Sequence, residues 1–441
     1  MRLRGMIAGL LVLATSALQA QAHDSAAAPG VPGLPKQVKW TFNFDAGIGA
    51  FGFGNSLYED RPDRPTPDLS DNWLESYVKP AISGVVHFGH KNGEVFGKLS
   101  AVGERTYSAP PPLVGEDASS FKVEDMYIGW RCGADCVRNP IEITVGRAPY
   151  KIGHGMLLWD GAAEGGSRGG FWSNARKAWG FAAVARFTPK HNTLEGFYLD
   201  KDELPESDAG TRVMGVNYER TLGEGNTLGA TYLHTLATDL GTRNGMNVFN
   251  VRAFVAPLKK MPGLSFELEY AYEKNADLIK ASAWNALAAY ELSGMKWKPK
   301  LSYRYAIFGG DDPATTTVNE GFDGLLTGFY DWGTWWQGEI AGEYFLSNSN
   351  LISHQVRVHL TPFESLSGGV MLYVFRNQHP ILPVTANAVA NELDVYSDWK
   401  VNANFIVSIV AALGDPKEAV EQASGRTSSF TYAMIYAAYA F

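Results

Sequence analysis

The sequence predicts an all-β protein, a transmembrane antiparallel β-barrel of about 18 strands with short periplasmic turns and long extracellular loops. Three observations lead to this fold class. Apolar and polar residues alternate with a period of two in many short segments. Beyond the first residues, no segment approaches the roughly 20 apolar residues of a membrane-spanning helix. The chain also ends in an aromatic strand, residues 431–441, that closes on Phe441.

The first segment has the features of a secretory signal peptide. Arg2 and Arg4 precede an apolar run that stops at Ala20-Gln21-Ala22, a small-residue cleavage site. We therefore expect residues 1–22 to be removed, residues 23–36 to form a flexible leader rich in Ala, Pro and Gly, and residues 37–441 to form the barrel.

Alternation is clearest in three segments, residues 40–48, 264–272 and 295–307. In the first, Trp, Phe, Phe, Ala and Ile alternate with Thr, Asn, Asp and Gly. Ionisable residues at every second position require water on the second face of the strand. A soluble β-sandwich also alternates, but its chain seldom ends on such an aromatic strand, and so the barrel is favoured.

Two-residue periodicity and turn residues together predict eighteen strands. Their expected ranges are 37–49, 76–89, 94–107, 121–132, 140–147, 178–188, 192–200, 211–221, 226–236, 246–256, 263–273, 278–292, 295–308, 351–361, 366–376, 391–401, 404–413 and 429–441.

Loop lengths support this count, because connections after even-numbered strands are short and several of those after odd-numbered strands are long. The long ones are 50–75, 148–177, 309–350 and 414–428. Within the third of these, residues 335–346 are expected to form a short helix over the mouth of the barrel.

Composition excludes some functions. With 46 acidic against 38 basic residues, the chain is a poor partner for nucleic acid. Cys132 and Cys136 flank Gly-Ala-Asp in a periplasmic turn, where a local disulfide is favoured over a metal site. Asp311 and Asp312 are weak candidates for Ca²⁺, with simple solvation the favoured alternative. No motif predicts catalysis or a cofactor.

A barrel of this size is too wide for its own side chains to fill, so the inward charges should set its function. A basic ladder, Lys296, Lys298, Lys300 and Arg304, is expected on one strand, and Arg357 on the next. These groups would attract an anionic solute through weak, exchangeable contacts. The alternative is pairing with Glu267 and Glu269 two strands away, which would only stiffen the wall.

A second basic group lies in and beside the glycine-rich loop 148–177. Guanidinium groups bind carboxylates bidentately, so this loop could fold inward as a constriction that recognises uronate groups. The alternative is an external loop solvated by its charges. The residues concerned are Arg147, Lys151, Arg168, Arg176 and Lys177.

Several short motifs between residues 140 and 441 resemble the alginate-export porin family. They are Gly146-Arg147, Arg176-Lys177-Ala178, Tyr303-Arg304-Tyr305-Ala306, Gly310-Asp311-Asp312, Phe322-Asp323, Gly338-Glu339-Ile340, Ser349-Asn350-Leu351, Thr361-Pro362 and Glu392-Leu393-Asp394.

The resemblance implies an 18-stranded monomeric barrel whose electropositive constriction passes a uronate polymer. The arginines beside matched motifs, Arg147, Arg176, Arg304 and Arg357, would line this pore. The sequence departs from the expected pattern in its many inward acids and in the aromatic stretch 332–336.

The expected function is passive transport of an anionic polysaccharide such as alginate, or its oligomers, across the outer membrane. The first alternative is a general porin for small hydrophilic solutes. The second alternative is a barrel enzyme that modifies lipids. Expected partners are outer-membrane lipid and lipopolysaccharide, the saccharide, and periplasmic export or uptake proteins.

Overall fold

The computed structural model describes residues 38–56, 70–87, 93–108, 117–132, 140–159, 161–223, 225–255, 261–315, 317–326 and 337–441. The expected signal peptide and leader, residues 1–22 and 23–36, lie outside the described residues.

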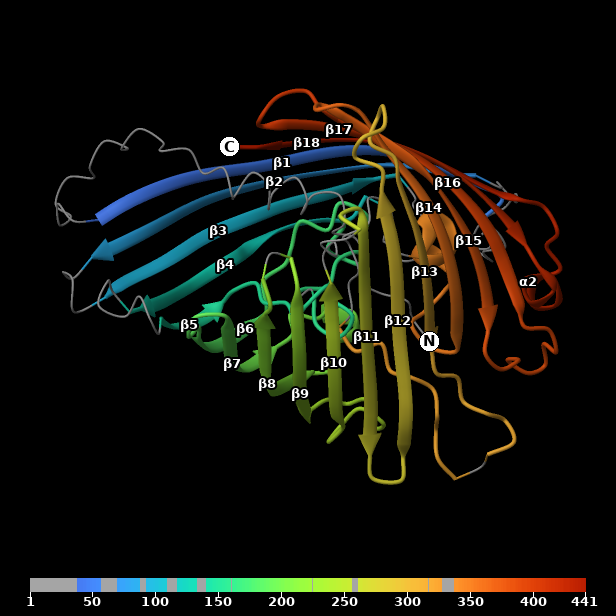
Figure 1. Cartoon of the computed structure of the whole chain (residues 1–441), viewed down its shortest axis with the longest axis horizontal. Helices are drawn as coiled ribbons and strands as arrows, with labels where there is room; N and C mark the ends of the chain where they lie inside the picture. The colour runs from blue at the N-terminus through green and yellow to red at the C-terminus, as the bar shows by residue number, and fades with distance from the viewer. Residues whose placement is uncertain are drawn as a thin grey trace.

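All eighteen predicted strands are present, and they form one antiparallel sheet (Figure 1). Each strand pairs with its neighbours in the sequence, and β1 pairs with both β2 and β18, which closes the barrel. The strands are β1 (Val38–Gly54), β2 (Ser70–His87), β3 (Glu94–Tyr107), β4 (Ser119–Arg131), β5 (Ile141–Arg147), β6 (Phe181–Phe187), β7 (Asn192–Asp200), β8 (Arg212–Thr221), β9 (Thr227–Ala237), β10 (Asn247–Val255), β11 (Leu264–Asn275), β12 (Ile279–Glu291), β13 (Lys300–Phe308), β14 (Leu351–Phe363), β15 (Leu366–Asn377), β16 (Ala388–Lys400), β17 (Phe405–Pro416) and β18 (Phe430–Ala440).

Buried and exposed residues alternate along the strands as predicted, and the exposed residues are the apolar ones, as in a membrane barrel. On β13, Leu301 and Tyr303 are 54% and 46% exposed, whereas Ser302 and Arg304 are buried. In this part of β13 the apolar side chains therefore face outward and the polar ones inward, the arrangement that a hydrocarbon exterior and an aqueous interior require. Phe308, farther along the same strand, is an apolar residue buried on the inner face.

The predicted thirteenth strand is too long at its start. β13 begins at Lys300, and Lys296 and Lys298 lie exposed in the turn after β12. Trp297 and Lys298 have φ of 68° and 45°, in the left-handed region that belongs to a turn and not to a strand. The prediction that Lys296 and Lys298 point into the lumen from a strand is therefore wrong.

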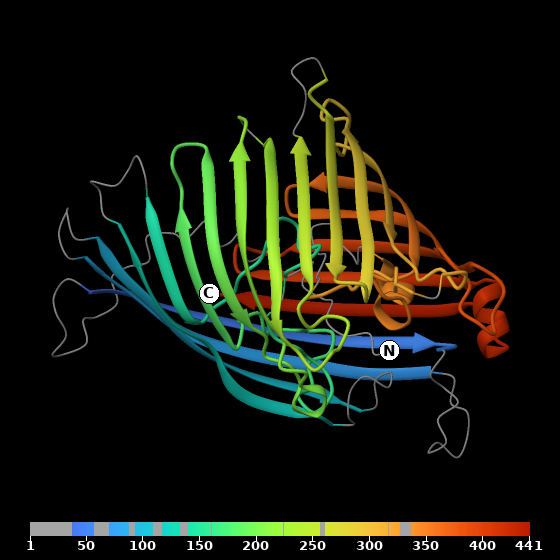
Figure 2. The same cartoon turned by 90° about the horizontal axis from the view of Figure 1, so that it is seen from below.

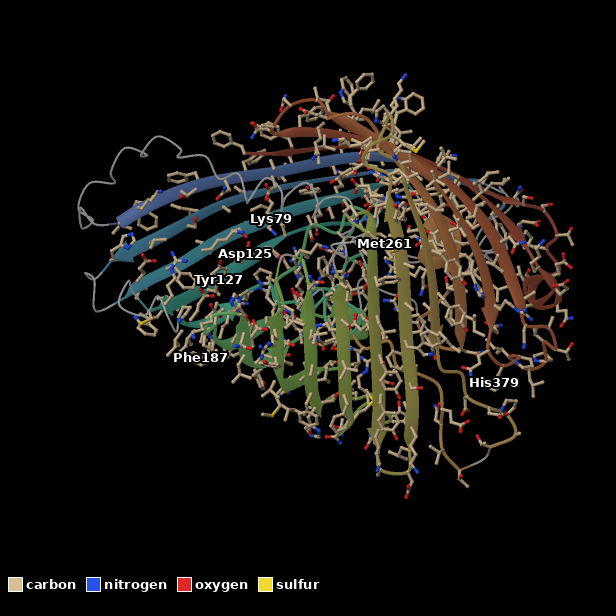
Figure 3. All side chains as sticks on the ribbon, in the orientation of Figure 1. Lys79, Asp125, Tyr127, Phe187, Met261 and His379 are labelled. Carbon is tan, nitrogen blue, oxygen red and sulfur yellow. The ribbon has the colours of Figure 1, made fainter. Side chains whose placement is uncertain are left out.

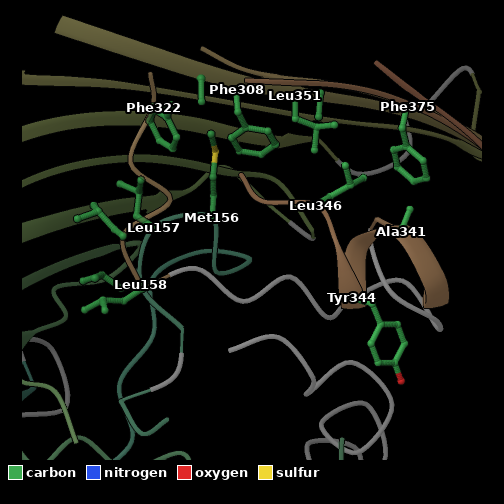
Figure 4. Packing of buried hydrophobic residues seen from close by; sticks show 14 of the residues in the cluster. Met156, Leu157, Leu158, Phe308, Phe322, Ala341, Tyr344, Leu346, Leu351 and Phe375 are labelled. Atoms are coloured by element: carbon green, nitrogen blue, oxygen red, sulfur yellow. The ribbon is translucent and has the colours of Figure 1, made fainter. Parts of the chain in front are cut away.

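Two long loops, each following an odd-numbered strand, fold into the barrel from the same end and meet inside it (Figure 2). The first inner loop, residues 148–180, joins β5 to β6, and the second inner loop, residues 309–350, joins β13 to β14. They meet where Trp159 N–H donates to the Leu326 carbonyl at 2.9 Å and Leu326 N–H to the Leu157 carbonyl at 3.1 Å. Around this seam the buried apolar residues include Met156, Leu157, Leu158 and Phe322 (Figure 4).

The second inner loop contains the predicted short helix, as the π-helix η3 (Gly338–Gly342). It packs against β16, β17 and β18, and its five residues are buried, so it lies against the wall instead of over the mouth. Of the predicted range, Trp335 and Trp336 lie outside the described residues. None of the helices in the described part of the chain is long and apolar enough to span a membrane.

Candidate functional site

Carboxylates on the inner wall hold the first inner loop by accepting its backbone N–H groups. Glu75 of β2 accepts from Trp172 at 2.8 Å and Ser173 at 2.7 Å. Glu124 of β4 accepts from Ala178 at 2.8 Å. Such bonds satisfy amide groups that a loop away from water would otherwise leave unpaired. Some of the inward-facing acidic residues therefore hold the first inner loop in place.

A β-bulge allows two consecutive acids of β4 to face the lumen. The β3–β4 register shifts between Leu99 and Ala101, and both Glu124 and Asp125 are buried. Asp125 forms an ion pair with Lys98 at 3.0 Å, and Lys79 of β2 lies 3.9 Å from the same carboxylate (Figure 3). A bulge re-aims side chains in this way, which strict alternation cannot predict.

Arg176 lies at the centre of the first inner loop's attachment and is fully buried. Its guanidinium approaches Glu104 at 3.1 Å, Glu164 at 3.7 Å and Glu124 at 3.9 Å. Burial, together with the neighbouring Glu104, raises the pKa of Glu164 well above its usual range. In this conformation Arg176 holds the loop and does not face the lumen.

Arg147 and Arg168 also bind protein groups, because both contact Asp202, just beyond β7. The distances to its two carboxylate oxygens are 2.7 Å for Arg147 and 2.8 Å for Arg168. Although burial opposes ionisation, the two arginines hold the pKa of Asp202 below its usual value. The basic loop thus folds inward, as one alternative predicted, with these two arginines paired. Two lysines of the predicted group remain. Lys177 is half-buried, and its backbone N–H donates to Glu124. Lys151 is exposed, and its ammonium group lies 4.4 Å from the centroid of the Trp159 ring.

The second inner loop is held in the same manner by β16. Glu392 accepts the N–H groups of Ile340 and Ala341, each at 2.8 Å, and Asp394 accepts that of Glu339 at 3.2 Å. A Cβ at Gly338, whose φ is +83°, would lie 2.4 Å from a Glu392 carboxylate oxygen. Only glycine fits there without displacing this carboxylate.

Arg304 is paired within the wall of the barrel, the alternative to a role in binding an anionic solute. Its guanidinium donates to Asn285 at 2.9 Å and lies 3.5 Å from Glu267 of β11, two strands away, and Arg304 is 2% exposed. Glu269, the other predicted partner, accepts instead from Asn250 at 3.0 Å.

Arg357 of β14 has a different environment. Its Nε donates to the Tyr396 hydroxyl at 2.8 Å, and His359 Nδ1 lies 2.6 Å from the same hydroxyl. Within the described residues, no ion pair joins Arg357 to a carboxylate, whereas eight other arginines each have one. These are Arg131, Arg147, Arg168, Arg176, Arg186, Arg243, Arg252 and Arg304.

Strand register gathers further groups around Arg357. Lys300, His359, Gly369 and Tyr396 are successive partners across β13, β14, β15 and β16. A Cβ on Gly369 would lie 2.9 Å from the Tyr396 hydroxyl, so the glycine leaves room for that ring. We call Lys300, Arg357, His359 and Tyr396 the Arg357 patch. It lies toward the periplasmic ends of these strands.

The acids proposed for calcium stabilise their own loop. Asp311 accepts the Glu320 N–H at 3.0 Å and Asp312 accepts the Ala314 N–H at 2.9 Å. In the described part of the chain, no group of three or more His, Cys, Asp and Glu side chains is arranged to bind a metal ion. Cys132 is disulfide-bonded, and Cys136, its expected partner, lies outside the described residues.

The family model described as alginate export matches residues 104–434. The chain belongs to the alginate-export family. Its barrel is also similar to solved porins, although no curated protein sequence matches it. OccAB2 of Acinetobacter baumannii has a TM-score of 0.56 at 13% identity, covering 91% of this chain and 98% of that one.

Two further structures are similar to this alginate-export barrel, each over 91% of it. A BenF-like porin from Pseudomonas fluorescens Pf-5 has a TM-score of 0.54 at 11% identity, with 98% of its own chain covered. The outer membrane protein OprD from Pseudomonas aeruginosa has a TM-score of 0.53 at 11% identity, with 94% covered. The family and the porin-like barrel together indicate a transport channel of the outer membrane.

The sequence did not predict which side chains contact each arginine of this alginate-export barrel. These contacts decide whether an arginine is neutralised or remains available to a solute. Alternation alone puts His359 on the same face as Arg357, and this signal was available. Tyr396 could not be assigned to Arg357 without the register of β14, β15 and β16, because about 40 residues of chain separate them.

Proposed function

We propose that this outer-membrane channel carries an anionic polysaccharide, alginate or its oligomers, by passive diffusion. The observation that supports this most is the Arg357 patch, a guanidinium on the inner wall that a tyrosine orients and that forms no ion pair within the described residues. Asp398 of β16 acts on this guanidinium only from beyond ion-pair distance. A guanidinium held in this way can exchange weak bidentate contacts with the carboxylates of a passing uronate chain.

The inward acids do not argue against an anionic solute. Glu75, Glu124 and Glu392 accept N–H groups from the inner loops, and Glu267 lies beside Arg304. Neighbouring groups offset the charge of these acids. The Arg357 patch therefore contributes more to the electrostatic potential that a solute meets in the lumen. Lys300, exposed at the start of β13, adds to it.

A general porin for small hydrophilic solutes is the second candidate. The inner loops favour it, because their seam at Leu158 and Leu326 crosses the interior and narrows the space for a polymer. In this case the Arg357 patch would select small anions.

Reversal potentials in planar bilayers under a KCl gradient, followed by addition of oligouronates, test the proposal. We expect anion preference and concentration-dependent block by oligouronates. Anion preference without block would favour the small-solute porin, and cation preference would remove both anionic substrates.

We further propose that residues 1–22 are cleaved during export and that the barrel functions as a monomer surrounded by outer-membrane lipid and lipopolysaccharide. Mass spectrometry of the purified protein would test both points, with His23 as the expected first residue.

A further inference from the structure

The turn between β12 and β13 combines lysines with an exposed tryptophan at the periplasmic mouth of the barrel. We call residues 292–299 the lysine turn, and Lys300 follows it as the first residue of β13. Lys296 and Lys298 are exposed, Trp297 is 46% exposed, and no acidic residue lies within the turn. The turn follows an even-numbered strand and therefore faces the periplasm, where it projects beyond the end of β12 (Figure 1).

Backbone hydrogen bonds fix the lysine turn beside β14. Leu292 N–H donates to the Pro299 carbonyl at 2.8 Å, which closes the base of the turn. Thr361 N–H of β14 donates to the Trp297 carbonyl at 2.7 Å, so the next strand holds the tip. Because β14 also carries Arg357, the turn and that guanidinium belong to one stretch of the wall.

Trp297 and Lys298 have backbone conformations that are costly for residues with a Cβ. Their φ values of 68° and 45° lie in the left-handed region, where glycine is favoured. Strain of this kind gathers at sites that bind ligands, because the strained side chain supplies an interaction that glycine cannot. The turn thus keeps an indole ring and an ammonium group where glycine would cost less.

The two lysines of the turn keep their charge available to a solute. Within the described residues, no ion pair joins Lys296 or Lys298 to a carboxylate. The Lys296 ammonium lies 5.2 Å from the centroid of the Trp297 ring. Glu291, the last residue of β12, is the cross-strand partner of Lys300 and not of either turn lysine.

Lys300 connects the lysine turn with the Arg357 patch. It is the cross-strand partner of His359, and it alternates with the outward Leu301, which puts it on the inner side of the strand. Cations therefore succeed one another along the wall, from the turn past Lys300 to Arg357. An anionic chain that contacts the turn would meet further cations as it enters the lumen.

We propose that the lysine turn is an entry site for the anionic saccharide on the periplasmic side, an inference that rests on the proposed function. Lys296 and Lys298 attract the saccharide over a distance and then contact its carboxylates as point charges. The Trp297 ring offers an apolar face on which a sugar ring can stack. The stack retains the saccharide at the mouth until Lys300 and Arg357 bind it.

The test measures current block in planar bilayers, with an oligouronate added to each chamber in turn. Lys296→Gln combined with Lys298→Gln removes two charges from the lysine turn. The matched control, Lys190→Gln combined with Arg220→Gln, removes two exposed charges from the periplasmic ends of β6–β8. Heat-modifiable migration on gels confirms that each barrel is folded.

We expect the association rate of block to fall roughly three- to tenfold in the turn variant, and only for oligouronate added to one chamber. The control should keep a rate close to that of the wild type. An equal fall in both variants, or from both chambers, would overturn the proposal, because overall charge would then be the cause. Unchanged rates in the turn variant would overturn it as well.

Trp297→Gly tests the ring and suits the φ of 68°, so this variant should fold. We expect blocking events to become about threefold shorter, whereas Trp297→Phe, which keeps an aromatic face, should retain most of their duration. Unchanged durations in Trp297→Gly would overturn the proposal and make the ring a membrane-interface anchor. A wild type that oligouronate does not block would contradict the polysaccharide function together with this inference. A blocked wild type with unaltered variants would contradict this inference alone.

Discussion

Arg357 and Tyr396 are joined across an intervening strand: the guanidinium of β14 donates to the hydroxyl of β16 at 2.8 Å, above Gly369 of β15. The hydroxyl fixes the direction of the guanidinium without cancelling its charge. Ion pairing, as at Arg304, would fix the direction and remove most of the field. This difference makes Arg357 the residue on which selectivity should depend.

Replacing Arg357 by Glu should shift the reversal potential toward cation preference, because the charge of the Arg357 patch falls by two units in a low-dielectric wall. Planar bilayers under a KCl gradient measure the shift. The matched control is Lys417→Glu in the loop after β17, which makes the same change in net charge outside the barrel. Equal shifts in the two variants would show that only overall charge matters.

Replacing Tyr396 by Phe should leave the sign of ion selectivity unchanged and weaken oligouronate block by roughly three- to tenfold. The charge of Arg357 persists, but the guanidinium and His359 both lose the hydroxyl that orients them. Concentration–block curves give the affinity. Unaltered block would show that the hydroxyl has no positioning role.

Replacing Arg304 by Met should lower the free energy of unfolding by about 2–4 kcal/mol, because Glu267 and the buried Asn285 lose a charged partner. Urea unfolding monitored by tryptophan fluorescence measures it. The variant Arg304→Met with Glu267→Leu should recover much of the loss. No recovery would mean that the ion pair is not the cause.

Replacing Leu326 by Asp should increase single-channel conductance, because a buried charge in the seam between the inner loops draws in water. Leu240→Asp is the control, since Leu240 lies 45% exposed in the loop after β9. An unchanged conductance in Leu326→Asp would place the narrowest point of the path away from this seam.

The attachment of the first inner loop at Asp202 should depend on pH. Because Arg147 and Arg168 hold the pKa of Asp202 below its ordinary value of 3.8, the contacts of Asp202 with these arginines contribute stability that is fully present above pH 3.8. That contribution is lost as the pH falls through the lowered pKa. Current fluctuations should therefore increase only in strongly acidic buffer, and Asp202→Asn should show them already at neutral pH. A transition near pH 6 in the wild type would contradict this account.

The strands could be predicted from sequence because their signal is local. Outward Leu301 and Tyr303 and inward Ser302 and Arg304 alternate within a few residues, and this pattern by itself establishes a sheet with one wet face. The start of β13 was misjudged because alternation continues through a turn, and the positive φ of Trp297 and Lys298 has no periodic signature. The bulge at Glu124 and Asp125 also has no periodic signature, because it is a shift in the pairing of β3 with β4.

By itself, the sequence determined an eighteen-stranded barrel, the face of most strand residues and the presence of two basic groups. Only the tertiary structure decided which of these charges are available to a solute. Arg176 is enclosed by three glutamates, Arg304 lies beside Glu267, and Arg357 contacts a tyrosine. The physical reason is that alternation depends on adjacent residues, whereas a charge is neutralised by groups that strand register and inward loops bring from distant parts of the chain.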